Sequence, residues 1–411
     1  MNVQPDLEFI RELKTAGGDT LKKCFQCATC SVACPLSSDK KPFPRKEMIW
    51  ASWGLKDKLV TDPDVFLCHQ CGDCTEKCPR GAKPGDTLGA IRAYAYQQFA
   101  WPKGLARLAT SAKNLPILIG LPAVVILFMW VLSTFIGGLS PVEIFRKQVE
   151  IGHPQHFWDF AKDGYQYFFG EWTFKWYGKN IAFIAVIMGV SSLIAIISCW
   201  MGVTRMWKAM VADMEIKATY RPSLWQFISQ FLWPSIWETL QHKRFKDCKT
   251  NYDRVSGHLP LVLAFIGLFL ATCWSLTKND ILGLIWPSLH GPMVWWDPFK
   301  LIANVSAIAM LYGIWILWKT RRKMEAEGRA SNTFYDWFLI WEIAAVGITG
   351  LLAELLRWGG GFPLTGYFVY YLHLISVMML FLYMPYTKFA HIVYRTVALC
   401  FERYRTSSFV Q

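Results

Sequence analysis

Long stretches with few or no charged side chains constrain this chain more than any other feature of its sequence. A helix needs roughly 20 residues to cross the hydrocarbon core of a bilayer, and six apolar stretches after residue 114 are long enough. The composition agrees, because charged residues make up only 18% of the chain and its mean hydropathy is +0.24. We therefore predict six transmembrane helices, at about 115–139, 180–204, 259–277, 301–318, 335–357 and 366–390.

Basic residues are concentrated in some of the segments between these helices. Segment 205–257 holds nine Lys and Arg and segment 319–333 holds five, whereas 278–300 holds only two. Because positively charged loops stay in the cytoplasm, we expect an inner (cytoplasmic) membrane protein whose N-terminal region, basic loops and C-terminal tail are cytoplasmic. The net charge of +13 follows these loops, which favours a lipid membrane and not a nucleic acid as the partner.

Two aromatic segments are predicted to lie along the membrane instead of crossing it. Segment 143–177 is the long outer connection and contains several Phe, Tyr and Trp residues. Segment 223–241 mixes Trp and Phe with polar residues at helical spacing, which is typical of a helix that lies in the headgroup region.

Eight of the twelve cysteines form two copies of one motif, C-x2-C-x2-C-x3-C-P, within the polar first part of the chain. This spacing is typical of ferredoxins that bind [4Fe–4S] clusters. Structural zinc sites usually have two separated C-x2-C pairs instead, and disulfides are rare in the cytoplasm. The sequence therefore predicts iron–sulfur clusters, with ligands Cys24, Cys27, Cys30 and Cys34 in the first copy and Cys68, Cys71, Cys74 and Cys78 in the second.

The fourth cysteine of each run ligates the other cluster in two-cluster ferredoxins. We therefore assign one [4Fe–4S] cluster to Cys24, Cys27, Cys30 and Cys78. The second cluster takes Cys68, Cys71, Cys74 and Cys34. This exchange of ligands makes the two clusters close neighbours, as an electron relay requires.

The histidines near the predicted helices are candidate haem ligands, because a polar ring in a bilayer is costly and usually has a partner or a function. His373 and His391 flank the last predicted helix, eighteen residues apart. Five helical turns would place both on one face about 27 Å apart, so that one helix could offer an axial ligand to one haem b near each membrane surface. The alternative is a pair of interfacial histidines with satisfied hydrogen bonds.

Each haem needs a second ligand at the same depth. His258 begins the third predicted helix on the side of His391, which makes these two the favoured pair. His242 could replace His258 or contact a quinone. On the other side the best partner for His373 is His290, with two further histidines, His153 and His156, behind it.

The predicted fold class is all-α. A helical double-cluster ferredoxin domain (1–113) is fused to a six-helix transmembrane cytochrome b bundle (114–411). His69, which lies between two cluster cysteines, is expected to tune or pack against a cluster. On the fifth helix, Glu342 and Glu354, together with Arg357, are candidates for the proton chemistry of a quinol site. The alternative for each carboxylate is a pairing with a neighbouring helix.

The two cysteine motifs resemble the small iron–sulfur subunit of heterodisulfide reductases. Segment 242–270, with His242, Arg254 and His258, is similar to the membrane cytochrome b of the same systems, and His373 and His391 are similar to the histidines of the nitrate reductase gamma cytochrome. The fusion of both halves resembles the membrane subunit of quinone-interacting membrane-bound oxidoreductase complexes.

This resemblance implies menaquinone, haem b and two flavoprotein partners related to the heterodisulfide reductase A subunit, with adenylylsulfate reductase as acceptor in sulfate respiration. We therefore expect a subunit that oxidises menaquinol and passes electrons through haem b and the clusters to soluble partners. One alternative is a heterodisulfide-reductase-like complex with another acceptor. The other is a membrane anchor or transporter without haem, whose clusters act as a sensor.

Overall fold

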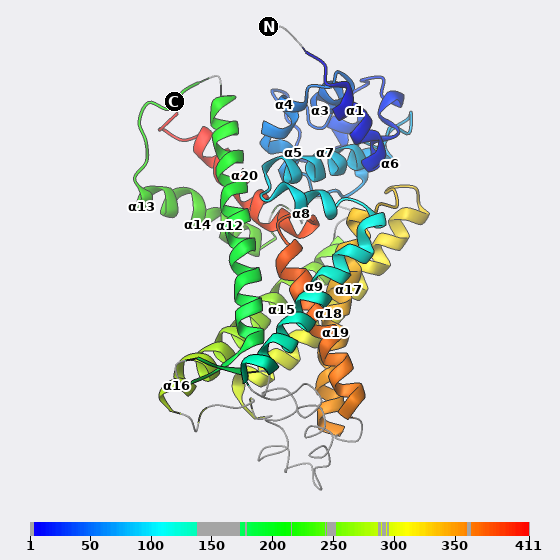
Figure 1. The fold of residues 1–411 in the computed structure, drawn as a ribbon. Helices are drawn as coiled ribbons and strands as arrows, with labels where there is room; N and C mark the ends of the chain where they lie inside the picture. Colours follow the sequence, from blue (N-terminus) through cyan, green and yellow to red (C-terminus); the bar gives the residue numbers. More distant parts are fainter. Residues whose placement is uncertain are drawn as a thin grey trace.

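The computed structural model describes residues 4–137, 173–176, 179–214, 216–242, 244, 252–286, 289, 293, 296–359 and 363–410. Its N-terminal part is a compact helical domain, and long helices extend away from one side of that domain (Figure 1). This arrangement agrees with the predicted helical fold. Of the described residues, only a short antiparallel pair, β1 (Thr173–Trp176) and β2 (Lys179–Ala182), departs from it.

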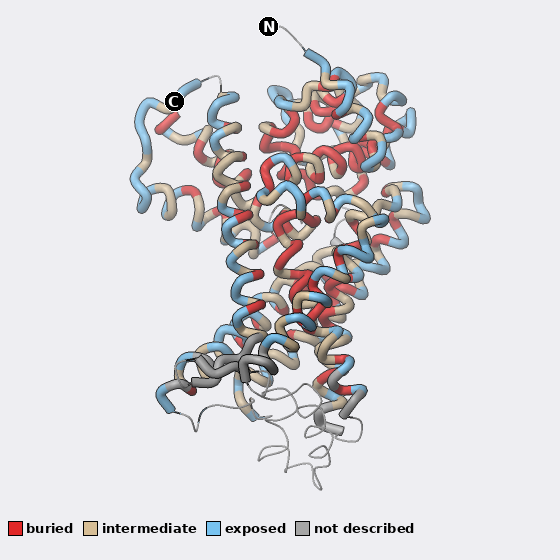
Figure 2. The backbone as a smooth tube through the Cα atoms, in the orientation of Figure 1, coloured by how far each residue is buried: buried red, intermediate tan, exposed pale blue. Residues whose placement is uncertain are grey.

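Short helices joined by the cysteine loops build the N-terminal domain. Asp6 caps the first of them by accepting a hydrogen bond from the Phe9 backbone N–H at 2.9 Å, which satisfies one of the free donors at a helix start. The longest helix of the domain, α7, is buried over most of its length (Figure 2). The elements are α1 (Leu7–Leu13), η1 (Lys14–Gly18), η2 (Leu21–Lys23), α2 (Thr29–Ala33), α3 (Arg45–Ser52), α4 (Lys56–Thr61), α5 (Pro63–Leu67), α6 (Asp73–Glu76), α7 (Pro84–Phe99), α8 (Lys103–Leu108) and η3 (Ala112–Asn114).

Five of the long helices are long and apolar enough to cross a membrane. They carry large apolar side chains on their outer faces, such as Trp200, Phe269 and Val305, each more than 60% exposed. Contiguous apolar surface of this kind is typical of contact with lipid. The five helices are α9 (Leu115–Gly137), α12 (Phe183–Ala212), α15 (Tyr252–Leu276), α17 (Pro298–Ala326) and α18 (Phe334–Gly359).

The last predicted crossing, 366–390, is not one continuous helix. Helix α19 (Pro363–Tyr383) ends before Pro385, and after η9 (Lys388–Ala390) the chain continues as α20 (His391–Arg405) at an angle of 55°. Proline cannot donate a helical hydrogen bond and its ring clashes with the preceding turn. The prediction that His373 and His391 share one helix face is therefore wrong, because they lie on two helices. Counting the bent pair as one span gives up to six crossings.

The predicted helix over 223–241 is present as α13 (Leu224–Phe227), η5 (Ile228–Leu232) and α14 (Trp233–Leu240). It runs crosswise to α12 (Figure 1) and exposes Trp225, Trp233 and Trp237. Its position in a headgroup layer stays a prediction. Two further short elements, η7 (Thr277–Leu282) and α16 (Gly283–Ile285), follow α15. Most of segment 143–177 lies outside the described residues.

The N-terminal domain and the apolar helices meet through α20 and the α17–α18 loop. Tyr394 of α20 packs against Phe66 and Tyr96, with ring centroids 6.1 and 4.7 Å away. In the loop, Ser331 donates to the Asp86 carboxylate from its backbone N–H at 3.0 Å and from its hydroxyl at 2.7 Å. The basic loop 319–333 and the C-terminal helix therefore lie on the same side of the apolar helices as the cysteine motifs.

Candidate functional site

Both cysteine motifs adopt the same backbone conformation. In the first, Gln26 and Ala28 have φ of 58° and 65°, and in the second Gln70 and Gly72 have φ of 52° and 86°. Each loop then enters a short helix, α2 or α6. Left-handed residues at matching positions turn successive cysteines toward a common centre, which is how a short loop can surround a cluster.

The structure brings the cysteines together in two groups across the two motifs. Cys34 lines one small cavity with Cys68, Cys71 and Cys74, so that a first-motif cysteine joins three from the second. Conversely, Cys24 and Cys78 are the thiols whose charges act most strongly on Cys30. The exchanged assignment predicted from the spacing places the same residues together, and the two complete ligand sets stay a prediction.

Burial raises the pKa of four of the eight thiols, namely Cys30, Cys34, Cys68 and Cys74. Desolvation raises the pKa of Cys30 to about 11 and that of Cys34 to about 12, with neighbouring thiolates adding to the effect. At Cys27, by contrast, hydrogen bonds from the Thr29 hydroxyl and backbone N–H lower the pKa. Iron binding stabilises such thiols as thiolates, even where burial has raised their pKa.

Three histidines from separate elements meet where the N-terminal domain contacts the apolar helices. His242 follows α14, His258 lies near the start of α15, and His391 begins α20. His242 Nε2 is 2.7 Å from His258 Nδ1, and the ring centroids of His258 and His391 are 6.2 Å apart. The structure thus brings together the favoured pair and its predicted alternative.

Backbone carbonyls determine which ring nitrogens carry protons when these imidazoles are neutral. His391 Nδ1 donates to the Lys388 carbonyl at 2.7 Å, and His242 Nδ1 donates to the Leu240 carbonyl at 2.9 Å. His242 Nε2 therefore accepts from His258 Nδ1. In both His258 and His391 the lone pair lies on Nε2, the arrangement of metal-binding histidines whose other nitrogen donates to a fixed partner.

His258 and His391 are the residues that could hold a haem iron, because haem iron accepts histidine ligands and both rings carry a lone pair on Nε2. Their ring centroids lie 6.2 Å apart, which would suit imidazole–metal bonds of about 2 Å from both rings. Glycines permit the close packing of α15 that positions His258: a Cβ on Gly313 of α17 would lie 2.6 Å from the Gly257 carbonyl oxygen.

A cavity of about 280 Å³ extends from the three histidines to the second cysteine loop, near the lower end of the size range of cofactor pockets. Its walls combine apolar side chains with six cations and three carboxylates, namely Arg92, Arg244, Arg254, Arg321, Lys388 and Arg395 with Asp86, Glu238 and Asp336. Arg244 pairs with Glu238, and Arg321 and Lys388 pair with Asp336. The cations in excess suit an apolar ligand with anionic groups.

Cationic side chains hold the second cysteine loop against the apolar helices. Arg254 donates to the His69 and Gln70 carbonyls at 3.4 and 3.0 Å, and Arg395 Nη2 is 3.0 Å from the nitrogens of the His69 ring. Arg254 precedes His258 by four residues, and Arg395 follows His391 by four. Each arginine is therefore one helical turn from a histidine, so that the helices carrying the histidines also hold the cysteine loop.

His69 itself is buried beside Cys68. Burial, together with the nearby Arg395, lowers the pKa of His69 to about 2. The ring is therefore neutral, and it fills the space between the second cysteine loop and the cavity, as expected for a residue that packs against a cluster.

The remaining predicted ligands lie elsewhere. His373 of α19 contacts the Thr349 hydroxyl at 3.1 Å and packs on Gly350 of α18. His290 lies outside the described residues. A second haem on that side stays a prediction.

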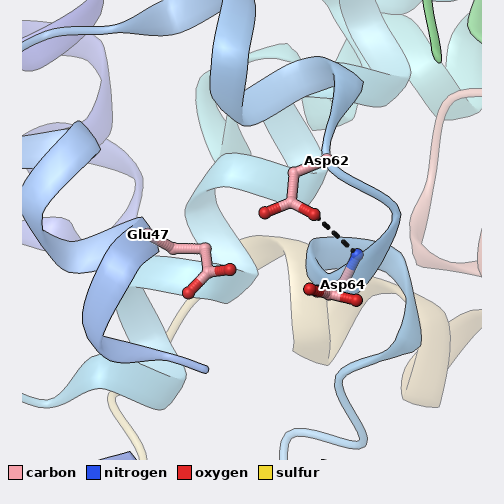
Figure 3. Close-up of side chains that lie close together, drawn as sticks. All are labelled: Glu47, Asp62 and Asp64. Carbon is pink, nitrogen blue, oxygen red and sulfur yellow. Dashed lines mark hydrogen bonds between the residues drawn. The ribbon is translucent and has the colours of Figure 1, made fainter. Parts of the chain in front are cut away.

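A buried acidic group lies in the N-terminal domain, where Glu47, Asp62 and Asp64 face one another (Figure 3). The Lys46 ammonium is 3.2, 2.9 and 2.7 Å from these three carboxylates, and so it takes the place that a bound cation would need. Burial, followed by the nearby Asp62, raises the pKa of Glu47 to about 9. This group is an internal ion pair that supports the domain.

Comparison with known proteins identifies the N-terminal domain. Residues 20–82 match the 4Fe-4S dicluster domain family. The chain is 42% identical over 88 residues to the C subunit of the H(2):CoB-CoM heterodisulfide,ferredoxin reductase of Methanothermobacter marburgensis, covering 21% of this chain and 47% of that one. It is 36% identical over 94 residues to a protein of Archaeoglobus profundus that is named as similar to the C subunit of heterodisulfide reductase, covering 23% and 48%.

A third relative is the C subunit of the Ferredoxin:CoB-CoM heterodisulfide reductase of Methanosarcina mazei, which is 32% identical over 91 residues, covering 22% of this chain and 55% of its own. The chain spans about half the length of these curated relatives. No solved structure matches. The N-terminal part of the chain is therefore a 4Fe-4S dicluster domain similar to the C subunits of heterodisulfide reductases, and it is joined to apolar, membrane-spanning-like helices. The prediction of a [4Fe–4S] dicluster domain is confirmed.

Sequence reasoning missed Lys388 and Arg395, the cations that join the two parts, and Arg92 of α7, which binds Gln70 together with Lys388. Arg92 donates to the Gln70 side-chain carbonyl at 3.1 Å, as does Lys388 at 3.1 Å. A signal for Arg395 was present, because Arg254-x3-His258 and His391-x3-Arg395 place Arg and His one turn apart on both helices.

Proposed function

We propose that this chain is the membrane subunit of a quinone-interacting oxidoreductase complex of an inner membrane. It takes electrons from menaquinol and passes them by way of haem b and two [4Fe–4S] clusters to soluble flavoprotein partners related to the heterodisulfide reductase A subunit. Adenylylsulfate reductase is the proposed final acceptor. The dicluster domain and its relatives support the electron-transfer part of this function.

The observation that carries the proposal is the pair His258 and His391, each with its lone pair on Nε2 and with ring centroids 6.2 Å apart. Haem b at this place would supply one-electron transfer between a quinol and the clusters. The chain's own residues orient the two imidazoles through His242 and the Lys388 carbonyl. Arg254 and Arg395 fix the adjacent cluster loop relative to both rings.

Oxidation of a quinol also releases protons, which need an acceptor near the site. Glu342 of α18 is buried, and its Oε1 has no hydrogen-bond partner among the described residues. Glu354 is instead bound by Lys300 at 2.7 Å and by Asn304 at 3.1 Å. Of the two predicted carboxylates, Glu342 is therefore the better proton acceptor, because Glu354 already has a charged partner.

The test is haem quantification on the purified full-length protein. We expect b-type haem by pyridine haemochrome in the wild type, its reduction by a menaquinol analogue, and loss of this haem in His258→Ala and in His391→Ala. Trp225→Ala, which removes an exposed aromatic ring of α13 far from both candidate ligand sets in the sequence, serves as the control and must retain it. A wild-type protein with iron–sulfur clusters and no haem would overturn the proposal, as would retention of all haem in both variants.

A heterodisulfide-reductase-like complex with another acceptor is the second candidate. It is favoured by the names of the relatives, which are subunits of heterodisulfide reductases. Both candidates share the haem pair and the clusters, and they differ in the acceptor. Copurification of the native complex, followed by assays with adenylylsulfate reductase and with a heterodisulfide, separates them.

A further inference from the structure

The two cysteine loops differ in their access to solvent. Cys27 is exposed on the surface of the first loop. Phe25 is 66% exposed and Val32 is 89% exposed, and both lie within the first motif itself. Apolar side chains of this size in water beside a redox centre are typical of a surface that a partner covers.

A cationic side chain packs on one of these apolar ones. The Arg80 guanidinium lies 4.1 Å from the centroid of the Phe25 ring, so the loop after the second motif reaches the first. Of the neighbouring acids, Glu76 is paired with Arg329 at 3.2 Å, while Asp19 is exposed. We call this surface the Cys27 face; around Cys27 it consists of the exposed residues Lys22, Lys23, Phe25, Val32, Lys77 and Arg80.

The second loop offers no comparable surface among the described residues. Cys68 and Cys74 are buried, and Arg254, Arg395 and the α17–α18 loop cover that side. A soluble redox protein can therefore approach the pair of clusters most closely at the Cys27 face. Because electron transfer requires close approach, this exposure selects the cluster of Cys24, Cys27, Cys30 and Cys78 as the one that exchanges electrons with solvent.

We propose that the Cys27 face is the docking site for an acidic soluble protein that carries a one-electron redox centre near its surface. Its acidic residues meet the lysines and Arg80, and an apolar patch covers Phe25 and Val32. One electron leaves the reduced cluster and reduces the partner's centre, or moves in the reverse direction, with no bond made or broken. This inference rests on the proposed electron-transfer function and adds the partner's chemistry and position.

The test uses the full-length protein and an acidic plant-type [2Fe–2S] ferredoxin as the probe. The reduced probe is mixed with the oxidised protein, and bleaching of the cluster absorbance is followed by stopped flow at low and high salt. We expect a rate that falls steeply with salt, because steering between opposite charges raises association rates tenfold or more. Arg80→Glu combined with Lys77→Glu should slow the reaction by about tenfold at low salt and much less at high salt.

Matched variants separate docking from damage to the clusters. Lys103→Glu combined with Arg107→Glu, both at exposed positions of α8, makes the same change in charge away from the face and should react like the wild type. Phe25→Gln should slow the reaction at both salt concentrations. All variants must keep the wild-type iron content, and reduced methyl viologen, which needs no docking surface, should reduce them at an undiminished rate.

Equal rates for the wild type and the Arg80 and Lys77 double variant would overturn the docking proposal, and so would an equal slowing by the Lys103 and Arg107 double variant. These results are independent of the haem. If the wild type holds no haem, the proposed function fails. The docking rates can then still be measured, because they depend only on the clusters. If haem is present and menaquinol reduces it, but the face variants have no effect, only the docking proposal fails.

Discussion

The two cysteine loops have the same spacing and the same backbone conformation, yet their surroundings are opposite. The first loop presents Cys27, Phe25 and Val32 to solvent. The second is buried against the apolar helices, and arginines one turn from His258 and His391 bind its backbone and the His69 ring. The comparison teaches that a local cysteine motif specifies a cluster, whereas the elements packed around each motif decide whether a soluble partner can approach that cluster.

The largest effect, the loss of a whole cluster, should come from replacing the fourth cysteine of either motif. Cys34→Ser should eliminate the buried cluster, because Cys34 shares a cavity with Cys68, Cys71 and Cys74, and it should leave the exposed cluster in place. Cys78→Ser should do the reverse. Iron analysis with electron paramagnetic resonance measures this, with a loss of about four irons per chain in each case. Loss of the same cluster in both variants would contradict the exchanged ligand sets.

Raising the pH should destabilise the N-terminal domain, which contains both cysteine loops. The raised pKa of Glu47, about 9 against an ordinary 4.5, means that the folded state favours the protonated carboxyl. The stabilising contribution is complete below about pH 4.5 and is lost as the pH rises through 9, so chemical unfolding should become easier by a few kcal/mol across this range. Glu47→Gln should flatten the dependence on pH, and an unchanged slope in that variant would contradict the assignment.

Removal of the arginines should affect the second loop alone. Arg254→Ala leaves the Gln70 carbonyl without its charged donor, which should cost about 1–3 kcal/mol in the free energy of unfolding. Arg107→Ala, on the exposed surface of α8, is the matched control and should change stability by less than about 0.5 kcal/mol. Protease sensitivity of the second loop measures the loosening; equal sensitivity in both variants would argue against a holding role.

The smallest effect should be confined to the exposed cluster. Thr29→Val removes the hydroxyl that hydrogen-bonds the Cys27 sulfur at 3.4 Å. Hydrogen bonds to cluster sulfurs favour the reduced, more negative state, so the reduction potential of that cluster should fall by on the order of tens of millivolts. A redox titration monitored by electron paramagnetic resonance should show the buried cluster unchanged, and a shift of both clusters would mean that the two are not electrostatically separate.

The sequence by itself determined the local features of this protein. The cysteine spacing predicted the dicluster domain, because that chemistry needs only short-range positions and turns along one loop. The apolar stretches predicted helices close to α9, α12, α15, α17 and α18, because crossing a bilayer demands length and hydrophobicity regardless of neighbours. The prediction of one continuous last helix was wrong at Pro385. The effect of proline on a helix is also local, so this break could have been predicted from the sequence.

Only the tertiary structure decided which loop faces the apolar helices and which faces solvent. It also placed His242 behind His258, identified Arg395 and Lys388 as contacts of the second loop, and showed Lys46 in the middle of three carboxylates. These contacts join residues separated by up to 326 positions. Helical periodicity carries no information about such pairs, because it describes which face a residue occupies and not which distant element packs against that face.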